Sequence, residues 1–325
     1  MKALVTGATG FVGSHLVEAL GRRRATITAL VRSPGKAALL TQHDVIQIRG
    51  DLANEEALRT AVSGQDVVFH VAGLVAARNE AEFFRANCDG TASLLRAIQT
   101  SGSTPRLVLV SSLAAVGPAV RGKPLRSDAV PHPVTQYGRS KLAAEELVRG
   151  AALPWTIIRP PVVYGPRDRE VLKVFQAARF GVAPIFGDGS QELSAVYAPD
   201  LAEALIAGAT SPSAIAHVYH ACHSELLTNA AMIQILGRAL GRDRAVHLVP
   251  IPFALGRAAL WCTGSFAGLM GRSTILTADK ANEFFQDAWT GDPAALTRDT
   301  GWSAANDLAS GAARTVAWYR EAGWL

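Results

Sequence analysis

The first twenty residues contain the feature that most constrains the fold, a short apolar run followed by a glycine-rich turn. Residues 3–5 are apolar, Thr6 ends the run, and glycines follow at positions 7, 10 and 13. Apolar residues then recur with helical spacing between positions 11 and 20. A strand, a tight turn and a helix in this order place a diphosphate at the N-terminus of the helix. The sequence therefore predicts a dinucleotide-binding unit.

The three glycines form the pattern GxxGxxG, which differs from the commoner GxGxxG of such units. We expect Gly7 to let the chain turn and Gly10 to let the backbone approach the phosphates. We expect Gly13 to let the helix pack closely against the sheet.

Apolar runs alternate with helical patterns through the first half of the chain. The expected strands are 26–31, 45–48, 67–70, 107–110 and 156–158, and the expected helices are 55–62 (with Asn54 as its N-cap), 81–99 and 136–149. Nearly continuous apolar strands separated by helices indicate a parallel sheet covered on both faces, the Rossmann-type doubly wound α/β class. In such sheets, ligands bind at the carboxyl ends of the strands.

The pattern changes after residue 164, where helical segments broken by turns predominate. We therefore expect a smaller, mostly helical substrate lobe that closes over the strand ends. The expected Rossmann domain comprises residues 1–164 and 194–222, and the expected substrate lobe comprises 165–193 and 223–325. The two parts are thus interleaved along the chain.

Composition limits the classes of protein to which the chain belongs. Its 325 residues are 49% hydrophobic and 18% charged, and the net charge of +5 is not clustered as in nucleic-acid-binding proteins. Cys88, Cys222 and Cys262 are far apart and lack CxxC spacing, which argues against a disulfide framework or a zinc site. Because an expected strand begins at the N-terminus, we expect no signal peptide. We expect a cytoplasmic protein without a metal site.

Residues 251–270 form the most apolar late segment, which Arg257 and several glycines interrupt. We expect a buried helix rather than a membrane span, with contact to a membrane surface as an alternative. Its large apolar side chains either line an apolar substrate pocket or pack in the core. They are Phe253, Leu255, Leu260, Trp261, Phe266, Leu269 and Met270.

A tyrosine and a lysine, Tyr137 and Lys141, are spaced i, i+4 on an expected helix and so share one face. A tyrosine has a reference pKa of about 10, and a nearby ammonium lowers it. Ser112 ends an expected strand and is suited to orient a substrate oxygen toward the tyrosine. Such a group exchanges a proton with a carbinol–carbonyl pair while a nicotinamide transfers the hydride.

Six motifs occur in one order: TGATGFVG at 6–13, HVAG at 70–73, Asn87 with Gly90-Thr91, Ser111-Ser112, YGRSK at 137–141 and RPPVVYGP at 159–166. In order and spacing they resemble the extended short-chain dehydrogenase/reductase family, also called the NAD-dependent epimerase/dehydratase family. The C-terminal stretch from Gly301 resembles the usual ending of these proteins. The resemblance thus covers nearly the whole chain.

The resemblance implies a role for each matching position. The cofactor diphosphate is expected to bind at Thr6, Gly7, Gly10, Phe11, Val12 and Gly13, and the adenine between Asp51 and Leu52. The cofactor ribose is expected to contact Ala72, Gly73, Tyr137 and Lys141. The backbone from Pro160 to Val162 is expected to bind the nicotinamide carboxamide. The implied catalytic triad is Ser112, Tyr137 and Lys141. Ser112 is preferred to Ser111 because family members place this serine five residues before a turn residue, here Gly117.

The roles of two other residues, Asn87 and His132, are each open to two interpretations. Asn87 either lies at the active site or supports a helix. His132 either contacts substrate or faces solvent, whereas we expect His15 and His70 to be structural. The resemblance also implies a homodimer formed through the helices near 81–99 and 136–149.

The residue after the second expected strand bears on the choice of cofactor. An acid at that place accepts a hydrogen bond from the ribose 2′-hydroxyl and repels a 2′-phosphate, but this chain has Arg32. An arginine pairs with a phosphate and stacks on adenine, so we predict NADP(H) in preference to NAD(H). The alternative is that Arg32 only stacks and both cofactors are accepted.

Two further positions bear on the substrate. Members that act on nucleotide sugars usually bind the sugar's diphosphate with an Asn and an Arg, at positions where this chain has Val162 and Leu193. Because a phosphate without polar partners is costly to bury, the sequence disfavours a nucleotide-sugar substrate. The RPPVVYGP form resembles the dihydroflavonol-reductase and 3β-hydroxysteroid-dehydrogenase branch, or the hopanoid-associated relatives.

The sequence therefore predicts an NAD(P)-dependent oxidoreductase that interconverts a secondary alcohol and a ketone on a mainly apolar small molecule. One alternative is a nucleotide-sugar epimerase or dehydratase with transient hydride transfer. A second is a sensor that binds the cofactor without catalysis, which the presence of both Tyr137 and Lys141 disfavours.

Overall fold

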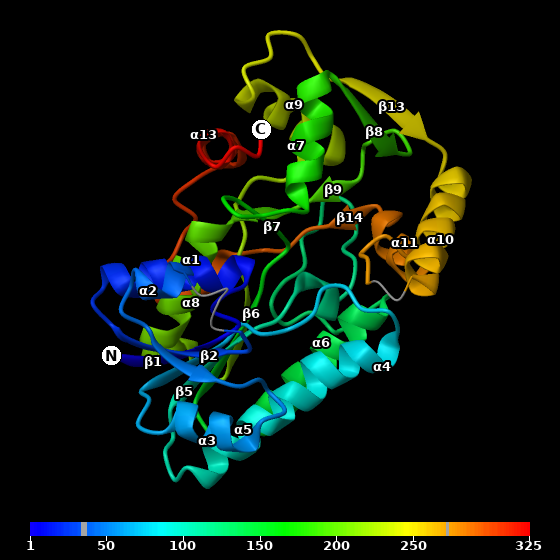
Figure 1. The fold of residues 1–325 in the computed structure, drawn as a ribbon. Helices are drawn as coiled ribbons and strands as arrows, with labels where there is room; N and C mark the ends of the chain where they lie inside the picture. Colours follow the sequence, from blue (N-terminus) through cyan, green and yellow to red (C-terminus); the bar gives the residue numbers. More distant parts are fainter. Residues whose placement is uncertain (34–37, 271–272) are drawn as a thin grey trace.

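The computed structural model describes residues 1–33, 38–270 and 273–325 of the chain (Figure 1). Its centre is a seven-stranded sheet in which all neighbouring strands are parallel. In spatial order the strands are β11 (His217–His220), β6 (Trp155–Arg159), β5 (Arg106–Val110), β4 (Val67–His70), β1 (Lys2–Thr6), β2 (Thr26–Val31) and β3 (Ile46–Arg49). The strand order reverses beside β1, and the Rossmann-type prediction is confirmed.

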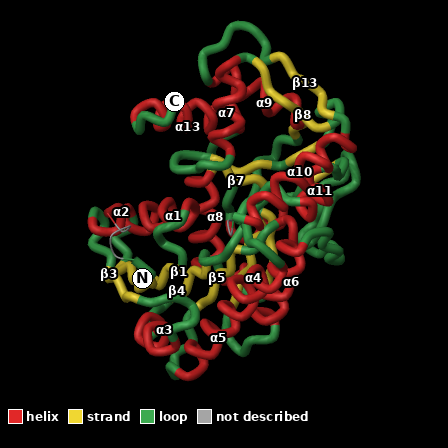
Figure 2. Tube along the Cα trace, turned by 45° about the vertical axis from the view of Figure 1, so that its right-hand side comes forward, coloured by secondary structure: helices red, strands yellow, loops and turns green. Residues whose placement is uncertain are grey.

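Helices cover both faces of this sheet, as Figures 1 and 2 show. One face packs against α1 (Phe11–Arg22) and α8 (Ala198–Thr210), and the other against α3 (Glu55–Val62), α5 (Gly90–Thr100) and α6 (Gln136–Arg149). Along β1, Ala3 and Val5 contribute to the first core and Leu4 to the second. Burial on both faces explains why the strands are apolar without alternation.

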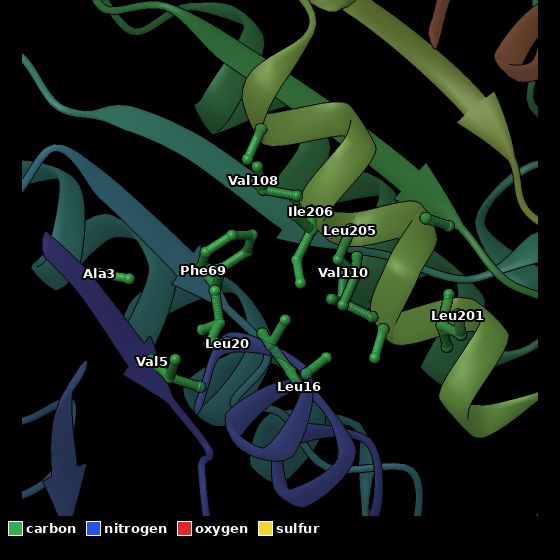
Figure 3. Close-up of a cluster of buried hydrophobic side chains, with 14 of the residues drawn as sticks. Ala3, Val5, Leu16, Leu20, Phe69, Val108, Val110, Leu201, Leu205 and Ile206 are labelled. Carbon is green, nitrogen blue, oxygen red and sulfur yellow. The ribbon is translucent and has the colours of Figure 1, made fainter. Parts of the chain in front are cut away.

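The core between the sheet and α1 and α8 fixes the position of the helix that follows the glycine-rich turn (Figure 3). Leu16 and Leu20 of α1 meet Phe69 of the sheet and Leu205 of α8. These side chains are completely buried. The helix N-terminus is therefore held at a fixed place above the end of β1.

The helix expected at 81–99 contains an irregular turn. It begins as α4 (Glu80–Phe83), passes through a π-helical stretch (Phe84–Asp89) and continues as α5. The hydroxyl of Thr91, at the start of α5, donates to the carbonyl of Asn87 within this stretch at 2.6 Å. A π-helical turn accommodates one extra residue and is frequent near functional sites.

The remaining elements form the substrate lobe and small connecting sheets. The substrate-lobe helices are α7 (Val171–Phe180), α9 (Asn229–Ala239), α10 (Phe253–Leu269), α11 (Ala278–Phe284) and α13 (Leu308–Glu321). The short α2 (Ala38–Thr41) lies in the other half, as does α12 (Ala294–Thr300), whose Leu296 belongs to the core between the large sheet and α8. The strand groups are β7 (Val162–Tyr164) with β10 (Ala195–Tyr197), β8 (Val182–Phe186) with β13 (His247–Ile251), and β9 (Glu192–Leu193) with β12 (Leu227–Thr228) and β14 (Ala288–Trp289). Single 3₁₀ turns lie at Leu113–Ala115 and Pro212–Ala214. The exact domain boundaries remain a prediction.

The late apolar segment forms α10, but this helix is not buried in the core as expected. Leu255, Trp261 and Phe266 are 64%, 61% and 65% exposed, whereas Leu260 is 4% exposed. The helix touches the protein along a narrow stripe, because Gly256 lies against Phe186 and Gly264 against Thr277. The side chain of Leu269 lies outside the described residues. No helix in the described ranges is both long and apolar enough to cross a membrane.

Candidate active site

The glycine-rich turn between β1 and α1 has the geometry of a phosphate cradle. Gly7 adopts φ +74°, and a Cβ at that position would lie 2.7 Å from the amide nitrogen of Ala72. A Cβ at Gly13 would lie 2.1 Å from the carbonyl oxygen of Gly7. Gly13 thus lets α1 begin against the turn itself, rather than only against the sheet as we expected.

The N-terminus of α1 is open to a ligand. Its N-cap, Gly10, provides no side-chain hydrogen bond, and the first turn, which starts with Phe11 and Val12, contains no acidic residue. Free amides and the helix dipole at such an end favour an anion. The residues present therefore fit the diphosphate of a dinucleotide.

Three buried polar side chains, linked by hydrogen bonds, support this turn. The hydroxyl of Thr6 bonds with Nδ1 of His70 at 2.8 Å and accepts from the amide of Ala72 at 3.2 Å. Nε2 of His70 bonds with Thr91 at 2.9 Å. Burial, together with the nearby Lys141, lowers the pKa of His70 to about 3, so its ring is neutral. Thr6 and His70 thus join β1, β4 and α5, and the side chain of Thr6 is too buried to touch a ligand.

Asn87 holds the loop that follows β4. Its side-chain oxygen accepts from the amide of Leu74 at 2.8 Å, and its nitrogen donates to the carbonyl of Leu74 and to the hydroxyl of Ser140. The amide group therefore has its partners within the protein. This favours the supporting interpretation of Asn87, which fixes Ala72 and Gly73 beside α6.

The structure brings the three expected catalytic residues together. Ser112 follows β5 and caps the next 3₁₀ turn, and its side chain lies near enough to Tyr137 on α6 to lower the pKa of that phenol. Lys141 lies one turn further along α6, where its Nζ donates to the carbonyl of Val110 at 2.7 Å. A Cβ on Gly73 would lie 3.7 Å from the same Nζ. The lysine therefore faces the edge of the sheet where the cofactor ribose is expected.

The protonation states differ from the sequence-based expectation. Burial raises the pKa of Tyr137 to about 12, although Ser112 acts in the other direction and Glu283 adds to the rise. Burial also lowers the pKa of Lys141 to about 8. In the protein alone, the expected lowering of the tyrosine pKa by Lys141 is therefore wrong, because desolvation of the phenolate dominates.

Ser111 points away from this group into a buried ion pair. Its hydroxyl donates to Glu145 at 2.6 Å, and the same carboxylate receives two hydrogen bonds from Arg159, at 2.8 and 2.7 Å. Glu145 and Arg159 are almost completely buried. The two neighbouring serines thus have different surroundings, as expected, with Ser112 beside Tyr137.

A part of the site that the sequence did not indicate comes from α11. Asp279 accepts from the backbone amide of Gln136 at 3.0 Å, directly before Tyr137. Lys280 places its ammonium 5.6 Å from the centre of the Tyr137 ring and pairs with Glu283 at 2.6 Å. The centre of the Phe83 ring lies 5.9 Å from that of Tyr137. Contacts across more than 140 residues leave no pattern in a sequence, which is why these residues were missed.

The other expected cofactor residues lie at the ends of their strands. Asp51 follows β3 and accepts from the amide of Ala53, and Leu52 packs against Gly90. Arg32 follows β2 and is exposed, with no ion pair to any residue in 1–33, 38–270 or 273–325. The carbonyl oxygen of Pro160 accepts a hydrogen bond from the amide of Leu113 at 2.9 Å. The structure thus places these residues at the ligand-binding edge.

Of the two positions expected to bind a sugar diphosphate, Leu193 has apolar surroundings, whereas Val162 is apolar only in its own side chain. Leu193 on β9 is buried among Tyr164, Tyr197 and Leu227. Val162 on β7 is exposed. His132 is exposed in the loop before α6, and the buried His15 bonds to the carbonyl of Pro166 at 2.9 Å. In the part of the chain that the structure describes, no group of three or more His, Cys, Asp or Glu side chains could hold a metal ion.

Comparisons with known proteins agree with this geometry. Residues 3–222 match the model of the NAD dependent epimerase/dehydratase family. The chain is 32% identical over 322 residues to the ceramide reductase of Caulobacter vibrioides, covering 99% of this chain and 95% of that protein. It is 32% identical over 257 residues to the 2-alkyl-3-oxoalkanoate reductase of Stenotrophomonas maltophilia, covering 75% and 77%.

A solved structure of MoeE5 in complex with UDP-glucose and NAD is similar over 99% of both chains, with a TM-score of 0.78 and 25% identity. Relatives of this family include both reductases and epimerases. The chain therefore belongs to the NAD-dependent epimerase/dehydratase family, the extended short-chain dehydrogenases/reductases, and is an NAD(P)-dependent enzyme of that family.

Proposed function

We propose that this enzyme reduces a ketone to a secondary alcohol, or catalyses the reverse reaction, on a mainly apolar substrate. The observation that supports this most is the apolar character of Val162 and of Leu193, beside a complete Ser112–Tyr137–Lys141 group. A substrate diphosphate would find no polar partner at Leu193, and burying it there would be costly. An apolar substrate meets no such penalty.

Each side chain of the proposed triad has a defined task. Ser112 orients the substrate carbonyl toward the hydroxyl of Tyr137, whose pKa it lowers through its nearby side chain. A pKa of about 12 keeps the phenol protonated at neutral pH, so Tyr137 is ready to donate its proton to the carbonyl oxygen. Lys141 holds the cofactor ribose at the sheet edge and supplies positive charge as the phenolate forms. The bound nicotinamide supplies the hydride.

The substrate class follows from the relatives that match most of the chain. One is a ceramide reductase that aligns over 99% of this chain, and another is a 2-alkyl-3-oxoalkanoate reductase. Both names describe a reduction on a molecule with alkyl chains. We therefore propose a long-chain lipid ketone, with the keto form of a ceramide as the first compound to test.

The test is an assay of purified protein with NADPH or NADH, monitoring nicotinamide absorbance and product identity together. The panel contains the keto form of a ceramide, a 2-alkyl-3-oxoalkanoate, small aromatic ketones and UDP-glucose. Net oxidation of the cofactor with a lipid ketone supports the proposal. Tyr137→Phe should lower turnover about 100-fold or more without changing the circular dichroism spectrum. A variant with near-normal turnover would contradict the role of Tyr137.

A nucleotide-sugar epimerase is the second candidate, favoured by the similarity to MoeE5, whose structure contains UDP-glucose and NAD. Conversion of UDP-glucose without net change in nicotinamide absorbance would establish it and refute our interpretation of Leu193. Tight cofactor binding with no conversion of any compound would instead indicate a sensor. For the cofactor, we propose NADP(H), with Arg32 pairing with the 2′-phosphate.

A further inference from the structure

The helix α10 is exposed over most of its surface, although its sequence is apolar. Among its 17 residues the single charge is Arg257, and the aromatic residues are Phe253, Trp261 and Phe266. In the described part of the helix, the side that lies against the protein runs through Gly256, Leu260 and Gly264, and Phe253 and Arg257 contact the ring of Phe285. An apolar helix with a narrow buried stripe leaves a large apolar face to be covered by something else.

The outward face has regular helical spacing. Leu255, Ala259, Cys262 and Phe266 follow one another at intervals of four, three and four residues, and all are exposed. Trp261 and Met270 flank this stripe and are 61% and 51% exposed. The outward face is therefore apolar from one end of the helix to the other.

The apolar surface continues onto the neighbouring strand pair. β13 leads directly into α10 at the outer edge of the molecule, and β8 lies beside β13 (Figure 1). On this pair Val182 and Val249 are 48% and 40% exposed, and Phe180 at the end of α7 is 83% exposed. Together with the outward face of α10, they make up an apolar edge of the substrate lobe.

The charge of this part of the sequence is mostly positive, although α11, which packs on α10, carries Asp279 and Glu283. From residue 226 to residue 278 the sequence contains a single acid, Asp243, and several arginines: Arg238, Arg242, Arg244, Arg257 and Arg272. Of these, Arg238, Arg244 and Arg257 are exposed, although Arg257 also lies over the ring of Phe285, and Arg272 lies outside the described residues. A cationic border beside exposed tryptophan, phenylalanine and leucine complements an anionic lipid surface.

We propose that the apolar edge formed by α10 and the β8–β13 pair docks on the surface of an anionic lipid bilayer. Leu255, Trp261 and Phe266 insert among the acyl chains, and the arginines meet the lipid phosphates. A second copy of this chain would bring a border of the same charge to the contact, which disfavours it as the occupant. Because α10 packs on α11, which covers Tyr137, docking places the active site beside the bilayer.

The inference does not depend on catalysis, so a binding experiment tests it. Purified protein is floated with vesicles of phosphatidylcholine alone and of phosphatidylcholine mixed with phosphatidylglycerol. We expect binding to the mixed vesicles that weakens as salt is raised. The double variant Leu255→Glu/Phe266→Glu should bind about 100-fold more weakly, because two apolar side chains no longer insert. The matched control is Ile46→Glu, since Ile46 is 53% exposed on β3, far from α10 in Figure 2.

A second measurement uses the exposed thiol of Cys262, which lies on the outward face of α10. An environment-sensitive dye on this cysteine, in a Cys88→Ser background, should shift to the blue when mixed vesicles are added. No binding by the wild-type protein at low salt would overturn the proposal, as would equal binding by the double variant. Self-association that the double variant abolishes, without vesicle binding, would assign the face to a second copy and also overturn it.

Discussion

The nucleotide-binding turn and α10 are both glycine-containing parts of this molecule, but the surrounding protein encloses them to different extents. Gly7 and Gly13 are enclosed by backbone at 2.1–2.7 Å from a hypothetical Cβ, and the turn rests on a completely buried polar chain. A Cβ on Gly268 in α10 would meet nothing within 4 Å. The first region is fixed by many internal contacts, whereas the second is attached by a single stripe.

This difference separates two tasks. Positioning a cofactor for hydride transfer demands fixed geometry, and the Rossmann half supplies it through packed cores and satisfied polar groups. Recognition of a variable substrate or surface requires only that a suitable face be presented. We therefore expect substitutions to be costly in the first region and mild in the second.

The largest effect on stability should come from Glu145→Gln. This change leaves the buried Arg159 without its counter-charge, and such losses cost about 3–5 kcal/mol. The matched control in the substrate lobe is Glu170→Gln, whose partner Lys173 is 62% exposed and where the change should cost less than about 0.5 kcal/mol. Urea unfolding measures both. If both variants lost the same unfolding free energy, the expected contrast between the two regions would be wrong.

A pair of glycine variants tests the same contrast within helices. Gly13→Ala should destabilise the protein by about 1–3 kcal/mol and weaken cofactor binding, since the new methyl group meets the carbonyl of Gly7. Gly268→Ala should be neutral or stabilise by up to about 1 kcal/mol, because alanine favours the helix. Thermal unfolding and titration with NADPH measure the two effects. A Gly13→Ala protein that binds normally would show that the turn is not rigid.

Acidification should weaken the nucleotide-binding half through His70. Its folded pKa of about 3 is below the usual 6.5, so the unfolded chain takes up the proton first as the pH falls. Stability is thus complete above pH 6.5 and is lost toward pH 3, at up to about 1.4 kcal/mol per pH unit. Urea unfolding between pH 7 and pH 4.5 gives this slope. The unfolding free energy of His70→Gln should depend less steeply on pH, whatever the absolute stability of the variant. An unchanged pH dependence would show that His70 is not its source.

The smallest expected effect concerns Arg32. If it pairs with a 2′-phosphate, Arg32→Ala should weaken NADPH binding about tenfold and leave NADH binding unchanged. Isothermal titration with each cofactor measures this. Arg24→Ala is the control, since this exposed arginine follows α1 rather than a strand end. Equal losses for the two cofactors would indicate stacking on adenine only.

Much of the fold could be predicted because its signals are local. The apolar strands and α6, at 136–149, occur where expected, and Asn54 caps α3 as expected through the amide of Ala57 at 2.9 Å. The π-helical turn was not predicted, because the contacts that stabilise it come from distant residues. The dimer and the cytoplasmic location stay predictions.

The candidate site was predicted less completely. The ordered motifs indicated Ser112, Tyr137 and Lys141, and the structure brings them together, whereas their catalytic roles remain proposals. Lys280 and Asp279 were missed because only the fold brings α11 to Tyr137. The exposure of α10 was also missed, since an apolar sequence does not show whether protein or another surface covers it.

The π-helical turn at Phe84–Asp89 makes this active site depend on the number of residues in its helix as well as on their identity. Each residue turns an α-helix by about 100°. Deleting one residue would restore regular winding and rotate Phe83 and α4 relative to Asn87 and α5. Either Tyr137 would lose its contact with the Phe83 ring, or the amide of Leu74 would lose its hydrogen bond to Asn87. A related enzyme with a regular helix here must therefore have solved this positioning with different side chains.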